Sequence, residues 1–203
     1  IKGDSIYKLT PKSNNSDEFN ETRICSRLIV KASTSGGDGF NHGFYLQWWD
    51  KNNHMKEQAF PATALHDPNS MIESLVCAGL SIVPKKVPDV LTYIEGYKPN
   101  LDFDCSTRTG WYNNKSFLLP SQSFRPEDDK RPLLLQGTDF IKNITGNKGT
   151  LEDWKVNVAK LCVGNSRLVV STCLAFAAPM LRVLNIESCG FHLVGDSSLG
   201  KST

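Results

Sequence analysis

The sequence has no long apolar run and no cysteine pair of the C-x-x-C type. No stretch approaches the ~18 consecutive apolar residues of a membrane-spanning helix, so we expect no membrane partner. The polar N-terminal stretch IKGDSIYKLTPKSNNSDEF lacks the apolar core of a signal peptide. These absences favour a cytoplasmic protein.

The six cysteines and four histidines also lack metal-ligand spacing. Most of the cysteines lie in apolar stretches such as ESLVCAGL, which favours buried free thiols in a reducing compartment over a disulfide framework. Charge of one sign is not in large excess, because the net charge is +2 and the pI is about 8.2. This balance is compatible with nucleic-acid binding without arguing for it.

The composition is that of a folded protein, since 39% of the 203 residues are hydrophobic and 22% are charged. That length allows one large domain or two small ones. The chain begins without Met and ends directly after a glycine-rich turn. We therefore expect it to be a piece of a longer polypeptide.

An antiparallel meander is predicted over residues 22–61. The stretch TRICSRLIVKAST alternates and is rich in branched side chains, and the turn SGGDG follows it. NHGFYLQWWD and HMKEQAFP, separated by DKNNH, read as two further strands. Residues 1–21 are polar and are expected to form an arm or linker.

Two helices are predicted to cover this meander. The first has Asp67 as its N-cap, Pro68 at its first position and Gly79 at its end. The second starts at Pro88 and carries an apolar stripe. The residues of that stripe are Val90, Leu91, Ile94 and Tyr97.

Strand character returns between residues 102 and 137. Asn113 and Asn114 predict a two-residue hairpin turn, and PLLLQG predicts one more strand. Asp102 and Asp104 lie two residues apart and form either a metal pair or, as we favour, part of a polar edge strand. Residues 22–148 are thus expected to form an α+β domain.

The pattern changes at residue 149. Thr150 and Asp153 resemble a capping box, and Gly164 is placed to end the helix that follows. SRLVVSTCLAFAAPMLRVL predicts an apolar helix that Pro179 kinks or splits, and CGFHLVG predicts a short strand. Residues 149–203 are therefore expected to begin an α/β P-loop NTPase domain with its leading helices, first strand and Walker A loop.

The chain ends on the pattern G-x-x-x-x-G-K-S of a phosphate-binding loop. Its glycines let backbone N–H groups surround phosphates, Lys201 reaches the β- and γ-phosphates of ATP, and the Ser202 hydroxyl ligates Mg²⁺. The expected phosphate-binding residues are Gly195, Asp196, Ser197, Ser198, Leu199, Gly200, Lys201, Ser202 and Thr203. The alternative is a structural glycine turn at the end of a domain.

The 203 residues do not include the helix after this loop, an acidic Walker B strand or an arginine finger. We assign no catalytic residue to them. We expect these residues alone to bind ATP weakly or not at all and not to hydrolyse it.

Aromatic and basic residues of the meander form a second candidate site. Tyr45 and Trp49 share one face of their strand, and alternation puts Arg23, Arg27 and Lys31 on one face of the neighbouring strand. The aromatic residues are either core side chains beneath the helices or a stacking platform like an OB-type sheet. In the second case the three basic residues contact phosphates of single-stranded DNA.

Four motifs together resemble a bacterial family described in places only as a domain of unknown function and elsewhere as superfamily II helicases and inactivated derivatives. They are GW followed by FLLP at residues 110–120, GTLEDW at 149–154, GNSRL at 164–168, and the phosphate loop. The resemblance covers about residues 22–203.

This resemblance implies an ATP- and Mg²⁺-dependent motor acting on DNA, encoded on prophages and other mobile elements, with subunit rings by analogy. Members of the family continue beyond the loop, so the activity is implied for the parent protein rather than for this piece. The alternative is a non-catalytic scaffold or partner-binding module of an inactivated ATPase.

Overall fold

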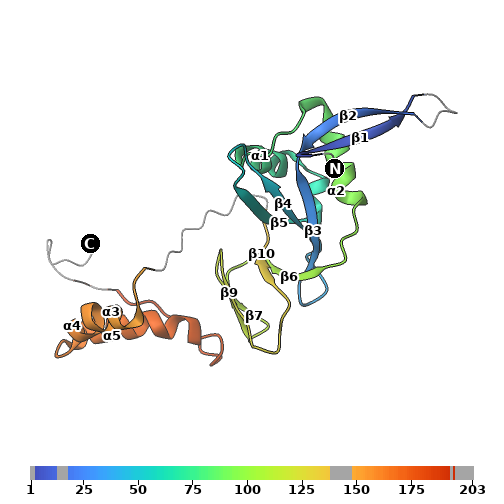
Figure 1. Cartoon of the computed structure of the whole chain (residues 1–203). Coiled ribbons are helices and arrows are strands. Elements are labelled where there is room, and N and C mark those ends of the chain that lie inside the picture. The colour runs from blue at the N-terminus through green and yellow to red at the C-terminus, as the bar shows by residue number, and fades with distance from the viewer. Residues whose placement is uncertain (1–2, 13–17, 138–147, 193, 195–203) are drawn as a thin grey trace. The chain divides into compact units, whose positions relative to one another are not determined.

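The structure is a computed structural model that describes residues 3–12, 18–137, 148–192 and 194. It divides into two compact units, Ile1–Gly146 and Asn147–Thr203 (Figure 1). Helices and strands both occur, so the predicted α+β class is confirmed.

A five-stranded sheet forms the centre of the first unit. Its strands, in spatial order, are β10 (Leu133–Leu135), β6 (Asp102–Ser106), β3 (Leu28–Ser35), β4 (Gly43–Trp49) and β5 (Met55–Pro61). β3, β4 and β5 form the predicted antiparallel meander. β6 pairs in parallel with both β3 and β10, so the sheet is mixed and not wholly antiparallel as expected. The cause is the long connection between β5 and β6, which allows β6 to run in the same direction as β3.

The two edge strands of this sheet meet at one point. Ala59 of β5 forms a parallel bridge with Gln136, which directly follows β10. The N–H of Gly137 donates to the Ala59 carbonyl at 3.1 Å, and Gln58 Nε2 donates to the Gly137 carbonyl at 3.0 Å. The sheet therefore curls until its edges are joined, as in a small barrel.

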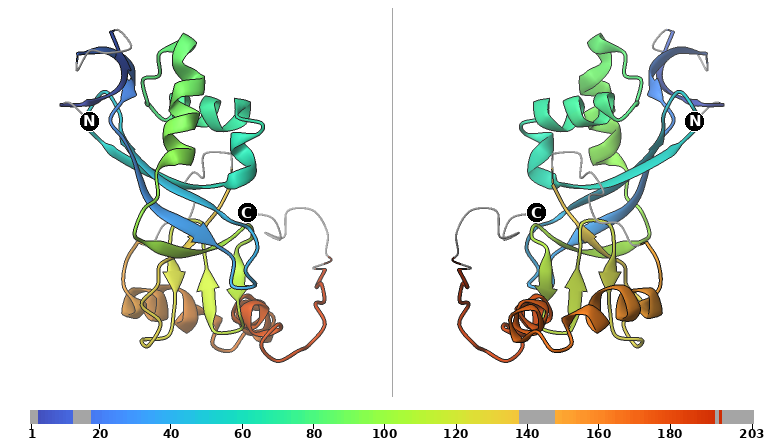
Figure 2. Two further views of the ribbon diagram at one scale, coloured as in Figure 1. Left: turned by 90° about the vertical axis from the view of Figure 1, so that its right-hand side faces the viewer. Right: turned by 90° about the vertical axis from the view of Figure 1, so that its left-hand side faces the viewer.

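One face of the sheet is covered by α1 (Asn69–Cys77) and α2 (Val87–Gly96), with the short 3₁₀ turns η1 (Ala62–Leu65) and η2 (Pro84–Lys86) beside them (Figure 2). Trp48 is fully buried here, and its Nε1 donates to the Ala78 carbonyl at 3.3 Å. The main core contains Leu28, Val30, Phe44, Leu46, Trp48, Phe60, Met71, Leu75, Val90 and Ile94. Helix packing thus follows the predicted stripe, except that Tyr97 is 48% exposed.

β3 changes faces at a bulge. Its pairing with β4 shifts between Val30 and Ala32, which leaves Lys31 as the extra residue. Val30 therefore packs under the helices, whereas Ala32 lies on the opposite face. There it is buried with Tyr45 and Ala59, and Phe103 and Leu134 pack against them.

The residues expected to form an arm or linker contain a strand. β1 (Ser5–Pro11) pairs antiparallel with β2 (Phe19–Ser26), and this ribbon extends away from the five-stranded sheet (Figure 1). The segment looked polar because Ile6 is its one buried residue among the described ones. The single strand predicted over residues 22–34 is broken at Arg27, where the pairing partner changes from β1 to β4.

A second small sheet consists of β7 (Gly110–Tyr112), β8 (Ser116–Leu118) and β9 (Ser123–Phe124). Asn113 and Asn114 have φ values of 50° and 56°, and the Lys115 N–H donates to the Tyr112 carbonyl at 3.2 Å. The predicted Asn-Asn turn is confirmed, because asparagine tolerates the left-handed region.

The ends of α1 were predicted with mixed success. Asp67 does not cap the helix, because α1 begins at Asn69 and Pro68 occupies the cap position without a side-chain hydrogen bond. Gly79 does end it, with φ +97°. The N–H of Leu80 donates to Leu75 and that of Gly79 to Val76, both at 2.9 Å, which is a Schellman motif.

The described part of the second unit is helical. α3 (Leu151–Trp154), a π segment η3 (Lys155–Ala159) and α4 (Lys160–Cys162) follow one another, and α5 (Ser166–Ala177) and η4 (Ala178–Met180) come after Gly164. The capping box is confirmed, since Thr150 and Asp153 exchange hydrogen bonds of 2.8 and 3.1 Å. In the described part of the chain, no helix is long and apolar enough to cross a membrane.

One expectation for this unit is confirmed in part and another is corrected. Pro179 interrupts the predicted helix, as expected, because α5 ends at Ala177 and Pro179 lies in η4, but no helix follows η4 among the described residues. Residues 189–192 and 194 do not form the predicted strand. A strand needs a partner strand, and the described residues of this unit offer it none.

The cysteines divide by environment. Cys25 and Cys105 are buried, and burial raises the pKa of each thiol to about 11. Cys77, Cys173 and Cys189 are exposed, so the expectation of buried thiols is wrong for them. The apolar stretches that contain them are covered on one side only or not at all.

Replacement of Gly79 by alanine is expected to destabilise the first unit by about 1–3 kcal/mol, because its φ is positive and a Cβ would lie 2.6 Å from the Asp50 Cβ. Urea unfolding followed by tryptophan fluorescence measures this. Gly96→Ala is the matched control, since a Cβ at this position would meet no atom within 4 Å and the φ of Gly96 is not positive. Equal stability of the two variants would contradict the prediction.

Candidate functional site

The face of β4 opposite the helices presents Tyr45, Gln47 and Trp49 in a row. The Arg27 guanidinium carbon lies 4.0 Å from the centroid of the Trp49 ring. Lys31 Nζ lies 5.5 Å from the Tyr45 centroid and 3.6 Å from the Glu57 carboxylate. We call Arg27, Lys31, Gln47, Trp49 and Glu57 the β4 strip.

The interruption between β2 and β3 and the bulge in β3 determine where the Arg27 and Lys31 side chains lie. Arg27 occupies the break between β2 and β3, and Lys31 is the bulge residue of β3. Both side chains thereby reach β4 on the face that the helices leave uncovered. A guanidinium over an indole ring is a cation–π contact, which orients Arg27 without neutralising its charge.

Four of the five predicted nucleic-acid contacts are brought together, and the fifth is not. Arg23 Nε donates to Ser5 Oγ at 3.0 Å and its Nη2 donates to Ser81 Oγ at 3.3 Å, away from the strip. Alternation predicted one face for Arg23, Arg27 and Lys31, but the break and the bulge each reset the alternation.

Tyr45 lies beside the strip but not on the surface. It is only 6% exposed, and its ring packs at 5.6 Å against the Phe103 ring. Its face is therefore not available for stacking with a base, which corrects that part of the prediction. Trp49 is partly exposed and Arg27 covers one side of its ring.

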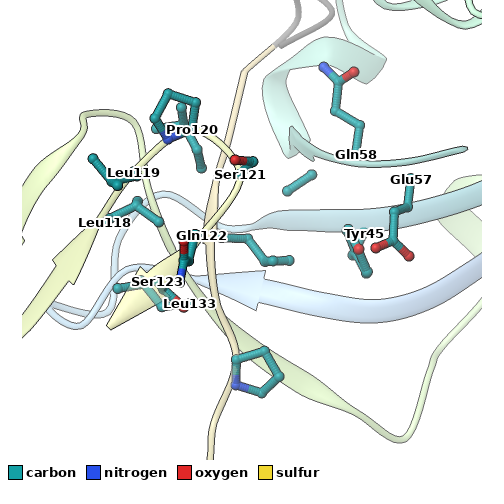
Figure 3. Close-up of a pocket in the computed structure, with 14 residues that line it drawn as sticks. Tyr45, Glu57, Gln58, Leu118, Leu119, Pro120, Ser121, Gln122, Ser123 and Leu133 are labelled. Atoms are coloured by element: carbon teal, nitrogen blue, oxygen red, sulfur yellow. The ribbon is translucent and has the colours of Figure 1, made fainter. Parts of the chain in front are cut away.

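A pocket of about 350 Å³ adjoins the Glu57 end of the strip. Figure 3 shows Tyr45 and Glu57 on one side of it and residues 118–123 on the other, while the Gln58 side chain points away. The lining residues are Tyr45, Glu57, Gln58, Ala59, Leu118, Leu119, Pro120, Ser121, Gln122, Ser123, Pro132, Leu133, Leu134 and Leu135. The pocket thus has both apolar and polar lining residues, with one carboxylate at its rim.

The polar groups at this rim are linked. Gln47 Nε2 donates to the Glu57 carboxylate at 3.3 Å. Burial raises the pKa of Tyr45, and a hydrogen bond to Glu57 raises it further. The Tyr45 hydroxyl therefore stays protonated beside the Glu57 carboxylate.

A buried ion pair joins β6 to the segment that follows β9. Arg125, which follows β9, has a side chain that is 10% exposed, and its Nη2 lies 2.7 Å from Asp104 Oδ2. Arg131 Nη1 lies 3.3 Å from Asp104 Oδ1, and Arg125 also contacts Asp129. These contacts tie both ends of residues 125–131 to β6.

Neither sequence interpretation of Asp102 and Asp104 holds. β6 lies between β3 and β10 and is not an edge strand. Asp102 is exposed, whereas the Asp104 carboxylate accepts hydrogen bonds from two arginines, Arg125 and Arg131. Within the described residues, no group of three or more His, Cys, Asp and Glu side chains is placed to hold a metal ion.

The phosphate-loop residues 195–203, including the predicted Mg²⁺ ligand Ser202, lie outside the described residues. Their roles stay predictions from the sequence.

Sequence reasoning missed Glu57, Gln47 and the pocket. Glu57 pairs with Gln47 in the register of β4 and β5, so a register assigned from the DKNNH turn could have placed the two side by side. Residues 118–123 meet β5 only through the tertiary fold, and no local signal indicates that contact.

Asp104→Ala is expected to lower the free energy of unfolding by about 3 kcal/mol, because it leaves the buried Arg125 without its main partner. Asp102→Ala on the same strand removes an exposed carboxylate and is expected to change stability by no more than about 0.5 kcal/mol. Urea midpoints of the two variants measure the difference. Similar midpoints would show that the ion pair does not stabilise this region.

No curated protein matches this chain. The model of a family described as a domain of unknown function matches residues 1–203, which confirms the coarser part of the resemblance, while the helicase-like part stays a prediction. The chain therefore belongs to the family Domain of unknown function (DUF927).

Proposed function

We propose that this chain is the N-terminal region of a cytoplasmic, ATP-dependent, helicase-like ATPase that acts on the DNA of a mobile genetic element. The observation that carries the proposal is the G-x-x-x-x-G-K-S pattern at residues 195–202, which follows two capped helices. Backbone N–H groups, Lys201 and Ser202 supply the donors and the ligand that Mg-ATP requires.

The β4 strip supports the DNA part of this proposal. Trp49 offers an aromatic ring that is partly exposed, and Arg27 holds a cation directly against it. Proteins that bind single strands combine these two elements, because bases stack on rings while cations meet phosphates. The face of the second and third strands of OB-type barrels binds oligonucleotides, and β4 and β5 are the second and third strands of this closed sheet.

In this proposal the first unit contacts single-stranded DNA and the second unit leads into the ATP site. ATP hydrolysis in the parent protein would then drive movement along the strand, with subunits assembled as a ring by analogy. Lys31 is paired with Glu57, so the electrostatic attraction is modest and comes mainly from Arg27.

A second candidate function, an assembly module, is favoured by the surface of the second unit. None of its described residues, 148–192 and 194, is buried. Large apolar side chains are exposed there, among them Leu151, Leu161, Leu168, Val170 and Phe176. A surface of this kind marks a region that packs against another body.

We expect saturable binding of a labelled single-stranded oligonucleotide, with a Kd of tens of micromolar or tighter by fluorescence anisotropy. Trp49→Ala should weaken it about tenfold by removing one stacking ring, without changing the salt dependence. Arg27→Ala should weaken binding and reduce the slope of log K against log salt by about 0.7, because it removes one phosphate contact.

Arg23→Ala is the matched control, since Arg23 is bonded to Ser5 and Ser81 away from the strip. It should bind DNA like the native chain. No binding at tens of micromolar would overturn DNA contact by this region and leave the assembly module as the surviving candidate.

The proposed ATP binding is tested in a protein that contains the phosphate-loop residues 195–203. Lys201→Ala should reduce Mg-ATP affinity at least about tenfold in calorimetry, because it removes the charge that meets the β- and γ-phosphates. Lys160→Ala, a lysine in the last turn of α4, is the control and should leave affinity unchanged. Mg-ATP affinity that survives Lys201→Ala would refute the phosphate-loop assignment.

A further inference from the structure

The pocket beside the β4 strip differs in chemistry from the strip itself. Its walls are mostly leucine, proline and alanine, and none of the described residues that line it is cationic. Arg27 and Lys31 lie outside it, on the strip. A hollow without cationic lining residues and a cationic surface therefore lie next to each other.

This division excludes ligands whose anionic part would have to enter the hollow. A phosphate or carboxylate inside it would meet the Glu57 carboxylate and find no compensating cation. A ligand with an apolar, flat part and a separate anionic part fits both surfaces at once. A nucleotide in a single strand has this form, with its base in the pocket and its phosphate at the strip.

The size of the pocket agrees with one base and not with a longer ligand. Its volume of about 350 Å³ is near the lower end of the range of ~300–1,000 Å³ usual for small-molecule sites. Leu119 and Pro120 lie on the side of the pocket opposite Tyr45 and offer apolar surface to a ring, and Ala59 also lines the pocket (Figure 3).

Glu57 determines which edge of a base can be accepted. A carboxylate only accepts hydrogen bonds, and Gln47 uses part of its capacity. Guanine presents two adjacent donors, N1–H and the N2 amino group, on its Watson–Crick edge. Thymine presents one donor between two carbonyl oxygens, which a carboxylate repels.

We propose that this pocket receives one unpaired base of single-stranded DNA, with guanine preferred over thymine through Glu57. The inference rests on the proposed DNA-binding function and adds a specificity site to it. Tyr45 and Trp49 are four residues apart on β4, or about 13 Å. One short strand can therefore contact Arg27 and Trp49 while another of its bases, further along the strand, occupies the pocket.

The test compares an all-thymine oligonucleotide with the same oligonucleotide carrying one central guanine, by fluorescence anisotropy on the full chain. We expect the guanine oligonucleotide to bind about tenfold more tightly. Glu57→Gln should bring this ratio close to one, and Leu119→Trp, which fills the pocket, should do the same. The measured quantity is the ratio of the affinities for the two oligonucleotides. Absolute affinity is unsuitable, because Glu57→Gln also frees Lys31 from its ion pair and so changes the affinity for every oligonucleotide.

Glu73→Gln is the control, since Glu73 is an exposed carboxylate of α1 and not a lining residue. It should keep the tenfold ratio. Equal binding of the two oligonucleotides by the native chain, or a ratio unaffected by Glu57→Gln, would overturn the pocket and leave the proposed DNA binding intact. Failure to bind either oligonucleotide would overturn both. If Leu119→Trp does not fold, Glu57→Gln alone decides.

Discussion

The strict alternation of β4 between two faces is the constraint on which the first unit depends. Phe44, Leu46 and Trp48 are buried beneath the helices, so the residues between them must face the other way. A shift of one residue in register would place Tyr45 and Trp49 under the helices and expose the main core. The same constraint therefore holds the core together and creates the candidate site.

The face of β4 opposite the helices is closed at one end and open at the other. Near Tyr45 it is closed by small neighbours and an aromatic ring, because Ala32 and Ala59 leave room for the Tyr45 and Phe103 rings. Toward Trp49 it opens, and the two cations of the strip reach it. The pocket lies beside this transition, where β5 and the segment ending in β10 come together at Gln136. Closure of the sheet thus brings residues far apart in sequence to one rim.

The second unit is stabilised by different interactions. Its helix ends are well satisfied, with the Thr150–Asp153 box at one and the Asn165 side chain at the next, and Trp154 packs edge-on against Phe176. Side chains thus cap the starts of these helices, whereas none of the described residues of the unit is buried. This combination is consistent with a segment whose apolar side chains gain their burial from a neighbouring body, whether an ATPase core or an assembly partner.

The sequence by itself determined the features that depend on near neighbours. The meander, the Asn-Asn turn, the stop at Gly79 and the capping box all follow from local sterics and hydrogen bonding. Only the tertiary structure decided the rest. The bulge at Lys31 depends on the register with β4, and the role of Asp104 depends on an arginine twenty-one residues away. Long-range packing chose these positions, because several local patterns were equally acceptable until a distant partner made one of them stable.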